Sequence, residues 1–223
     1  MSKADVKTNP VIIRVWQPTD SKNNPISYKD AFIEGRNPGH VSIETKEFYS
    51  SFWPEKGDIR IVKLESLSDV VPMVSSLFAV APGRFFSDLR KDELAEAFSS
   101  GLPQGVQKKS DVEVILHTLD VNAMKQAFEK FQADIPGWTT VGDSIINRKA
   151  GQSCSSLAFN LLMAGGIQKL VGWYDTQIMF VAPSHIATLA IKAKAAEDKL
   201  IQASVQAAAQ PEEQSQVEII SRL

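Results

Sequence analysis

The position of the only cysteine, Cys154, constrains this chain more than any other feature. A lone thiol excludes an internal disulfide and a thiolate-rich metal cluster, and it fits a reducing compartment. Cys154 lies in the run GQSCSSLAFNLLMAGG, over residues 151–166, where a polar turn leads into a short amphipathic helix that two glycines end. A thiol in the first turn of a helix faces unpaired N–H groups and the positive end of the helix dipole, which favour the thiolate. Cys154 is therefore a candidate nucleophile.

The candidate base lies far upstream, at the start of an alternating, strand-like stretch over residues 40–45. In a strand, His40 shares one face with Ser42 and Glu44, while Val41 and Ile43 lie on the other. A cysteine at a helix start and a histidine on a strand form the pair that a thiol hydrolase needs. The three histidines of the chain fall in separate elements, so we expect no metal site and no cofactor.

The composition of the 223 residues is that of an ordinary globular protein, with 43% hydrophobic and 22% charged residues. A net charge of −2 gives no reason to expect a nucleic acid as partner. No apolar run is long enough to span a membrane, so integral insertion is not expected. Residues 1–10 lack the apolar core of a secretory signal, which predicts a cytoplasmic protein.

The hydrophobic pattern predicts a mixture of strands and helices, an α+β fold. Strands are expected at 11–16, 40–45, 49–53, 59–64, 112–119 and 177–182, and helices at 88–100, 121–133 and 154–164. The strands at 40–45 and 49–53 should form a hairpin. Residues 55–110 are interpreted as an insertion that covers part of the core. Its helix is expected to bury Leu89, Leu94, Ala97 and Phe98, and the helix over 121–133 to bury Met124, Ala127, Phe128 and Phe131.

The last forty residues differ in composition from the rest. Residues 184–210 are rich in alanine and nearly free of helix breakers, and apolar residues recur at steps of three and four. This pattern predicts one long helix with a weak heptad seam, because alanine buries little area. Pro211 ends it, and residues 211–223 are predicted to be a flexible acidic tail. The chain thus divides into a domain over 1–183, a helix over 184–210 and a tail.

The order of His40 on a strand and, much later, Cys154 at a helix start resembles the circularly permuted papain-fold superfamily. That superfamily includes the NlpC-like peptidases and amidases and the lecithin:retinol acyltransferase group. The motifs are Gly39-His40-Val41-Ser42-Ile43 and the run from Ser153 to Phe159. The resemblance covers roughly residues 10–183, and it implies a papain-like core with an antiparallel sheet packed on the cysteine-bearing helix.

The resemblance also implies roles for these residues. Cys154 would attack an acyl carbon to give a thioester, and His40 would protonate the leaving group. Family members orient the imidazole with a third polar residue on the strand after the histidine. That strand offers only the serines Ser50 and Ser51 here, so Glu44, on the face of His40, is slightly preferred over Ser51. The implied activity is that of a thiol hydrolase or acyltransferase on a peptide, amide, ester or thioester.

Two further interpretations concern the tail and the alternatives to catalysis. Residues 211–223 resemble the C-terminal translocation signals of bacterial type IV secretion substrates, which implies an effector that acts on a host protein or another host acyl compound. The main alternative is a non-catalytic interaction module on the same fold, favoured by the weak third residue. A helical assembly protein built on the seam of residues 184–210 is a third interpretation.

Overall fold

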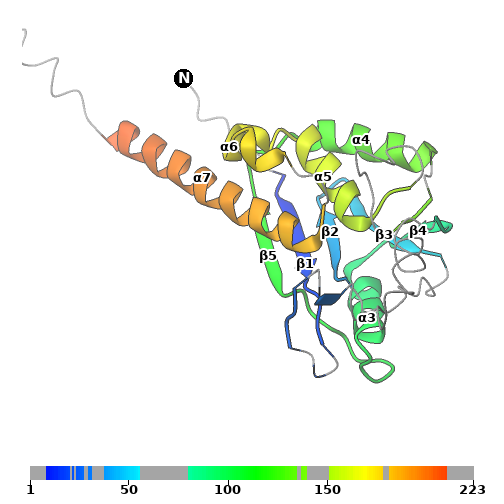
Figure 1. Ribbon diagram of the computed structural model, residues 1–223. Helices are drawn as coiled ribbons and strands as arrows, with labels where there is room; N and C mark the ends of the chain where they lie inside the picture. The colour runs from blue at the N-terminus through cyan, green and yellow to red at the C-terminus, as the bar shows by residue number, and fades with distance from the viewer. Residues whose placement is uncertain are drawn as a thin grey trace, which may run out of the picture.

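Five antiparallel strands form one sheet at the centre of the computed structural model, and helices pack around it (Figure 1). The structure describes residues 9–20, 22, 24–27, 30–31, 38–55, 80–134, 137–139, 151–177 and 181–209. The strands are β1 (Val11–Trp16), β2 (His40–Glu44), β3 (Tyr49–Pro54), β4 (Gly83–Phe85) and β5 (Val112–Leu116). Their order across the sheet is β4-β3-β2-β1-β5. The predicted α+β class is confirmed.

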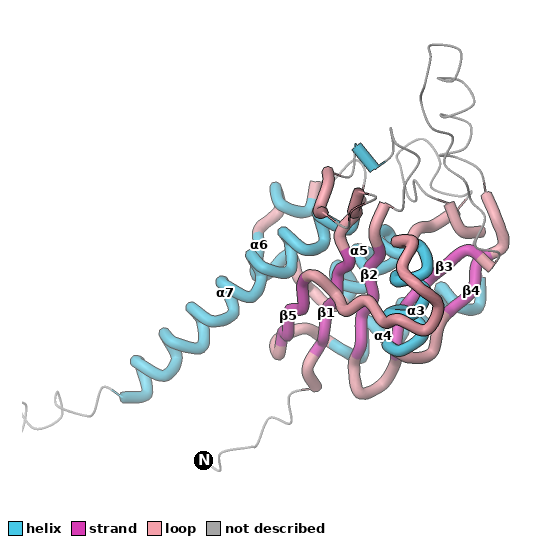
Figure 2. The backbone as a smooth tube through the Cα atoms, turned by 90° about the horizontal axis from the view of Figure 1, so that it is seen from below, coloured by secondary structure: helices cyan, strands magenta, loops and turns pink. Residues whose placement is uncertain are grey.

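The helices are α3 (Leu89–Ser99), α4 (Val121–Asp134), α5 (Cys154–Ala164), α6 (Gln168–Val171) and α7 (Pro183–Ala209), with a 3-10 turn, η2 (Tyr174–Thr176). Figure 2 shows α7 as a long rod that leaves the body of the molecule past β5. None of the described helices has the length and apolarity needed to cross a membrane.

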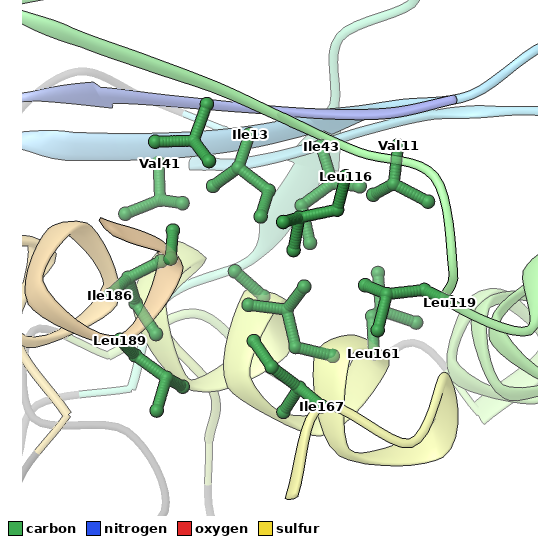
Figure 3. Close-up of a cluster of buried hydrophobic side chains, with 14 of the residues drawn as sticks. Val11, Ile13, Val41, Ile43, Leu116, Leu119, Leu161, Ile167, Ile186 and Leu189 are labelled. Atoms are coloured by element: carbon green, nitrogen blue, oxygen red, sulfur yellow. The ribbon is translucent and has the colours of Figure 1, made fainter. Parts of the chain in front are cut away.

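The hydrophobic core lies between the sheet and the helices α5 and α7 (Figure 3). Val11, Ile13, Val41 and Ile43 point from the sheet toward Leu161, Ile186 and Leu189. These residues alternate with His40, Ser42 and Glu44 in β2 and with Ile12 and Arg14 in β1, so each strand buries one apolar face under the helices. Most residues of α5 are buried, which suits its central place in this core.

Several predicted elements are confirmed with boundaries that differ by only a few residues. The strand at 11–16, the 40–54 hairpin and the strand that begins at Val112 are present, and the hairpin pairs Ser42 with Ser51. Asp120 caps α4 through the N–H of Ala123, and Met124 and Phe128 are buried as expected. The long C-terminal helix is present as α7.

Other predictions fall outside the described residues or differ from the structure. The strand expected at 59–64 and the tail at 211–223 lie outside the described residues. The strand expected at 177–182 is described only in part: residues 178–180 are outside, and Gln177, Val181 and Ala182 are not in a strand. The apolar face predicted for α3 is confirmed only at Ala97, while Leu89 and Leu94 are only partly buried. Phe98 is 75% exposed, and the buried residues of α3 are Asp92, Glu96 and Ala97. The helix turns a polar face inward because it covers a polar group of strand residues.

Candidate active site

Cys154 is the first residue of α5, and a double cap fixes it there. The Ser153 side chain accepts the N–H of Ser156, while the Ser156 side chain accepts the N–H of Ser153, which is a capping box. Gln152 stabilises this cap further, since its Oε1 accepts a hydrogen bond from Ser156 Oγ at 2.8 Å. Cys154 is only 7% exposed, so the residue is shielded from most water.

His40 is the first residue of β2 and is almost fully buried between two tryptophan rings. Its imidazole stacks on Trp53 with ring centroids 4.2 Å apart, and Trp16 lies 5.5 Å away. Gly39 precedes it with a φ of 88°, and a side chain there would meet the Trp16 carbonyl. Glycine is needed at this turn both for its left-handed backbone and for its close approach to β1. The aromatic walls and the turn leave the imidazole little freedom to rotate.

One nitrogen of the imidazole, Nε2, faces a serine and a carboxylate. It lies 3.0 Å from Ser51 Oγ and 3.5 Å from Asp92 Oδ1. The Ser51 hydroxyl donates to Asp92 Oδ1 at 2.5 Å, so its oxygen is free to accept the Nε2–H. Trp53 Nε1 donates to the same carboxylate oxygen at 2.8 Å. These contacts fix the orientation of the imidazole at its Nε2 atom.

Asp92 comes from the first turn of α3 and is fully buried. Its second oxygen, Oδ2, accepts the hydroxyl of Tyr49 at 2.5 Å. Burial alone would raise the pKa of Asp92, but the charge of His40 and the hydrogen bonds from His40, Ser51 and Tyr49 hold that pKa below its usual value. The carboxylate is therefore charged at neutral pH although it has no contact with bulk water.

The electrostatics favour a positively charged imidazole. Burial alone would lower the pKa of His40, but the negative charges of Cys154 and then Asp92, with hydrogen bonds to both, raise it to about 10. Imidazolium beside a thiolate is the resting state in which a cysteine acts as a nucleophile near neutral pH. His40 thus interacts electrostatically with both Cys154 and the carboxylate of Asp92.

The structure brings together three of the four candidate residues, Cys154, His40 and Ser51. Glu44 lies elsewhere: its carboxylate pairs with Arg14 Nη1 at 2.5 Å, and Glu113 binds the Nε of the same arginine at 2.7 Å. Glu44 lies four residue steps along β2 from His40, a distance of about 13 Å, so sharing a face does not bring the two side chains into contact. The preference for Glu44 as the orienting residue is corrected, since the carboxylate beside the imidazole is Asp92.

Asp92 had no distinguishing signal in the sequence. It lies four residues after the helix cap Asp88 and four before Glu96, a spacing that an exposed acidic helix face also shows. Asp92 would have been identified as buried if the polar face of α3 had been assigned to the interior. That assignment requires knowledge of the residues that α3 covers. Within the described residues, no group of three or more histidine, cysteine or acidic side chains could hold a metal ion.

Comparison of the chain with known protein families, with curated proteins and with solved structures finds no match. The case for a function therefore rests on the geometry of the site and on the resemblance of its motifs.

Proposed function

We propose that this protein is a thiol hydrolase or acyltransferase with a papain-like core, and that it acts through a covalent acyl-enzyme on Cys154. The observation that carries the proposal is the buried imidazole of His40, held at Nε2 by Ser51 and Asp92 and coupled electrostatically to Cys154. Burying a charged carboxylate and a charged imidazole is costly, and a merely structural site is rarely built this way.

The proposed reaction has two stages. The Cys154 thiolate adds to the carbonyl carbon of an amide, ester or thioester, and the backbone N–H of Cys154 stabilises the oxyanion. The intermediate collapses as the bond to the leaving group breaks, and His40 transfers its proton to that group. The resulting thioester is then attacked by water, or by another nucleophile in an acyl transfer, while His40 accepts the released proton. No cofactor takes part in this scheme.

Asp92 strengthens this proposal over the interaction-module alternative, which was favoured by a weak third residue. The third group differs from the pattern of the papain-fold superfamily, because the carboxylate comes from α3 and reaches the imidazole partly through Ser51 of β3. Ser51 does lie on the strand that follows the histidine strand, where family members place this residue. A carboxylate behind that serine supplies the negative charge that a hydroxyl alone lacks.

The experiment that tests the proposal is alkylation of Cys154 by iodoacetamide in the folded protein, followed as a function of pH. Because the chain has one cysteine, the incorporated label reports on this thiol alone. We expect rapid alkylation well below the pH of about 8.5 at which a free thiol titrates, and loss of that advantage in His40→Ala. The matched control is His117→Ala, which removes an exposed histidine outside the site and should leave the rate unchanged. Equal rates in wild type and His40→Ala contradict the proposal.

We also propose, from the tail resemblance, that the substrate lies in a host cell. A fusion of residues 184–223 to a translocation reporter tests this part separately. Delivery of the reporter through a type IV system is expected, and failure of delivery contradicts secretion without bearing on the chemistry of the site.

A further inference from the structure

Three alternate residues of β3 donate hydrogen bonds to one carboxylate. Tyr49, Ser51 and Trp53 lie at steps of two along the strand, so they share one face of the sheet. The Ser51 hydroxyl and Trp53 Nε1 donate to Asp92 Oδ1 at 2.5 and 2.8 Å, and the Tyr49 hydroxyl donates to Oδ2 at 2.5 Å. Both oxygens of the buried carboxylate are therefore held by side chains of a single strand.

Tyr49 differs from the other two donors in its distance from the imidazole. Ser51 and Trp53 also contact His40 directly, through a hydrogen bond and through ring stacking. The hydroxyl of Tyr49 lies instead on the second oxygen of Asp92, and the hydrogen bonds described for it are with that carboxylate and with a serine of β2. An effect of this hydroxyl on the thiol must therefore pass through the carboxylate and the imidazole.

The hydrogen bonds around Tyr49 run toward the carboxylate. A phenol has one proton and an ionised carboxylate can only accept, so the Tyr49 proton lies toward Asp92. The hydroxyl of Ser42, 3.2 Å from the phenol oxygen, then acts as a donor to that oxygen. Hydrogen bonds in such a chain strengthen one another, because a phenol that accepts one becomes a better donor. The chain ends on the charge that faces His40.

Asp92 depends on this third donor because the residue is fully buried. A buried carboxylate is stable as an anion where its lone pairs accept hydrogen bonds. Within the described residues, Tyr49 is the donor that reaches Oδ2, and its hydrogen bond is one of the interactions that oppose the effect of burial on the pKa of Asp92. Without the phenol, burial would favour the neutral acid, which does not stabilise the imidazolium of His40.

We infer that Tyr49 is a positioning residue of the proposed reaction. It holds Asp92 ionised and turned toward His40, and through that pair it sets the lowest pH at which Cys154 reacts as a thiolate. The inference rests on the proposed function and extends it to a side chain whose hydroxyl lies one carboxylate away from the imidazole. A purely structural hydroxyl would affect the stability of the fold and leave this pH unchanged.

The titratable groups around the carboxylate are consistent with this role. His40 of β2 and Tyr49 of β3 act on Asp92 directly, and Glu96 lies one turn further along α3, also buried. Arg14 of β1 acts on Tyr49 and favours its ionisation, but burial and the charge of Asp92 outweigh it and raise the pKa of the phenol well above its usual value. Tyr49 therefore keeps its proton, and remains a donor, at every pH of the test below.

The test compares the pH profile of Cys154 alkylation by iodoacetamide in the wild type and in Tyr49→Phe, which removes the hydroxyl alone. Because Asp92 is protonated at a higher pH without the phenol, the acid side of the profile should move up by about one pH unit, and alkylation there should be about tenfold slower. At higher pH, where Asp92 is ionised in both proteins, the rates should converge. The matched control is Tyr174→Phe, which removes the same hydroxyl from a ring that is 87% exposed and should leave the profile unchanged.

Two further variants separate positioning from damage to the fold. In Asp92→Asn the side chain cannot titrate, so adding Tyr49→Phe to it should produce no further shift of the profile. Ser42→Ala leaves the hydrogen bond between Tyr49 and Asp92 in place and removes the donor to the phenol, so it should produce a smaller shift in the same direction. Circular dichroism identifies the variants that fold, and Ser42→Ala decides the test if Tyr49→Phe does not.

A shift in Tyr49→Phe that is absent from Tyr174→Phe and from the Asp92→Asn background supports the inference. A Tyr49→Phe profile equal to that of the wild type overturns it, and so does an equal shift in the Asp92→Asn background. If Tyr49→Phe does not fold, an unshifted profile of Ser42→Ala overturns it. Failure of the proposed function gives a different result, since the wild type would then react like a free thiol and His40→Ala would change nothing.

Discussion

The two faces of β2 carry opposite kinds of interior. On one face Val41 and Ile43 enter the apolar core beneath α5 and α7. On the other, His40 and Ser42 are equally buried, but their neighbours are the polar side chains of β3 and of α3. The apolar side is held by area removed from water, which many combinations of residues can supply. The polar side depends on particular pairs of atoms, because each buried donor and charge needs its own partner.

This contrast predicts that substitutions on the polar face affect chemistry more than stability, while those on the apolar face do the reverse. A comparison of single variants from the two faces therefore separates effects on the proposed chemistry from effects on the free energy of unfolding.

The largest effect is expected for His40→Ala. Loss of the proton donor and of the charge that faces Cys154 should lower kcat/KM with an acyl probe by on the order of 10³-fold. Steady-state kinetics on folded protein, with circular dichroism as the check, measures this. An activity within tenfold of the wild type would show that the imidazole takes no part in the reaction.

Leu161→Ala tests the other face of the sheet. Leu161 is buried in the core at the centre of α5, and its truncation should reduce the free energy of unfolding by about 2–5 kcal/mol. Urea denaturation measures the change. The rate of Cys154 alkylation per folded molecule should stay close to that of the wild type. A large loss of reactivity with little loss of stability would mean that the two faces are not separable.

Asp92→Asn should have the next largest effect, because it removes the charge behind His40 with almost no change of shape. We expect kcat to fall on the order of 10²-fold, about 2.7 kcal/mol at 1.36 kcal/mol per factor of ten. The pH profile distinguishes positioning from simple damage. In the wild type the protonated form of His40 persists until the pH rises through about 10, so activity should fall there. Without the Asp92 charge the pKa of His40 is lower, and this decline should begin at a lower pH. An unchanged profile would assign Asp92 a structural role only.

Ser51→Ala removes the hydroxyl between His40 and Asp92 and should cost about tenfold in kcat, since a hydrogen bond to a charged group contributes about 1.5–3 kcal/mol. Ser50→Ala is the matched control, because Ser50 is buried on the neighbouring position of β3 and points to the opposite face. Equal effects of the two substitutions on activity would contradict the proposed relay.

The smallest effect is expected for Glu44→Gln. Glu44 lies on the strand face of His40 but pairs with Arg14, and it is partly exposed. Its loss should change stability by about 0–1 kcal/mol and activity by less than about twofold. A strong loss of activity, measured with the same acyl probe, would restore Glu44 as a member of the site.

The sequence predicted the apolar half of this architecture better than the polar half. Periodicity identifies Val41, Ile43 and Met124 as buried because their hydrophobicity repeats with the period of a strand or helix. It also selected Cys154 and His40 as candidates, since a thiol at a capped helix start has a local signature, and the structure brings the two residues together. Asp92 has no such signature, because a buried and a solvated carboxylate look alike in one sequence. Its role depends on the docking of α3 against β3, which is a tertiary event, and the same event explains why the predicted inward face of α3 is confirmed only at Ala97.

The order of these residues along the chain has a consequence for biosynthesis. His40 and Asp92 leave the ribosome before Cys154, and the helix that begins at Cys154 lies at the centre of the core. The nascent chain therefore carries the proposed acid–base residues before it carries the proposed nucleophile. The thiol gains its charged neighbour only when α5 packs on the sheet beside α7. The proposed reactivity of Cys154 thus depends on the completion of the fold.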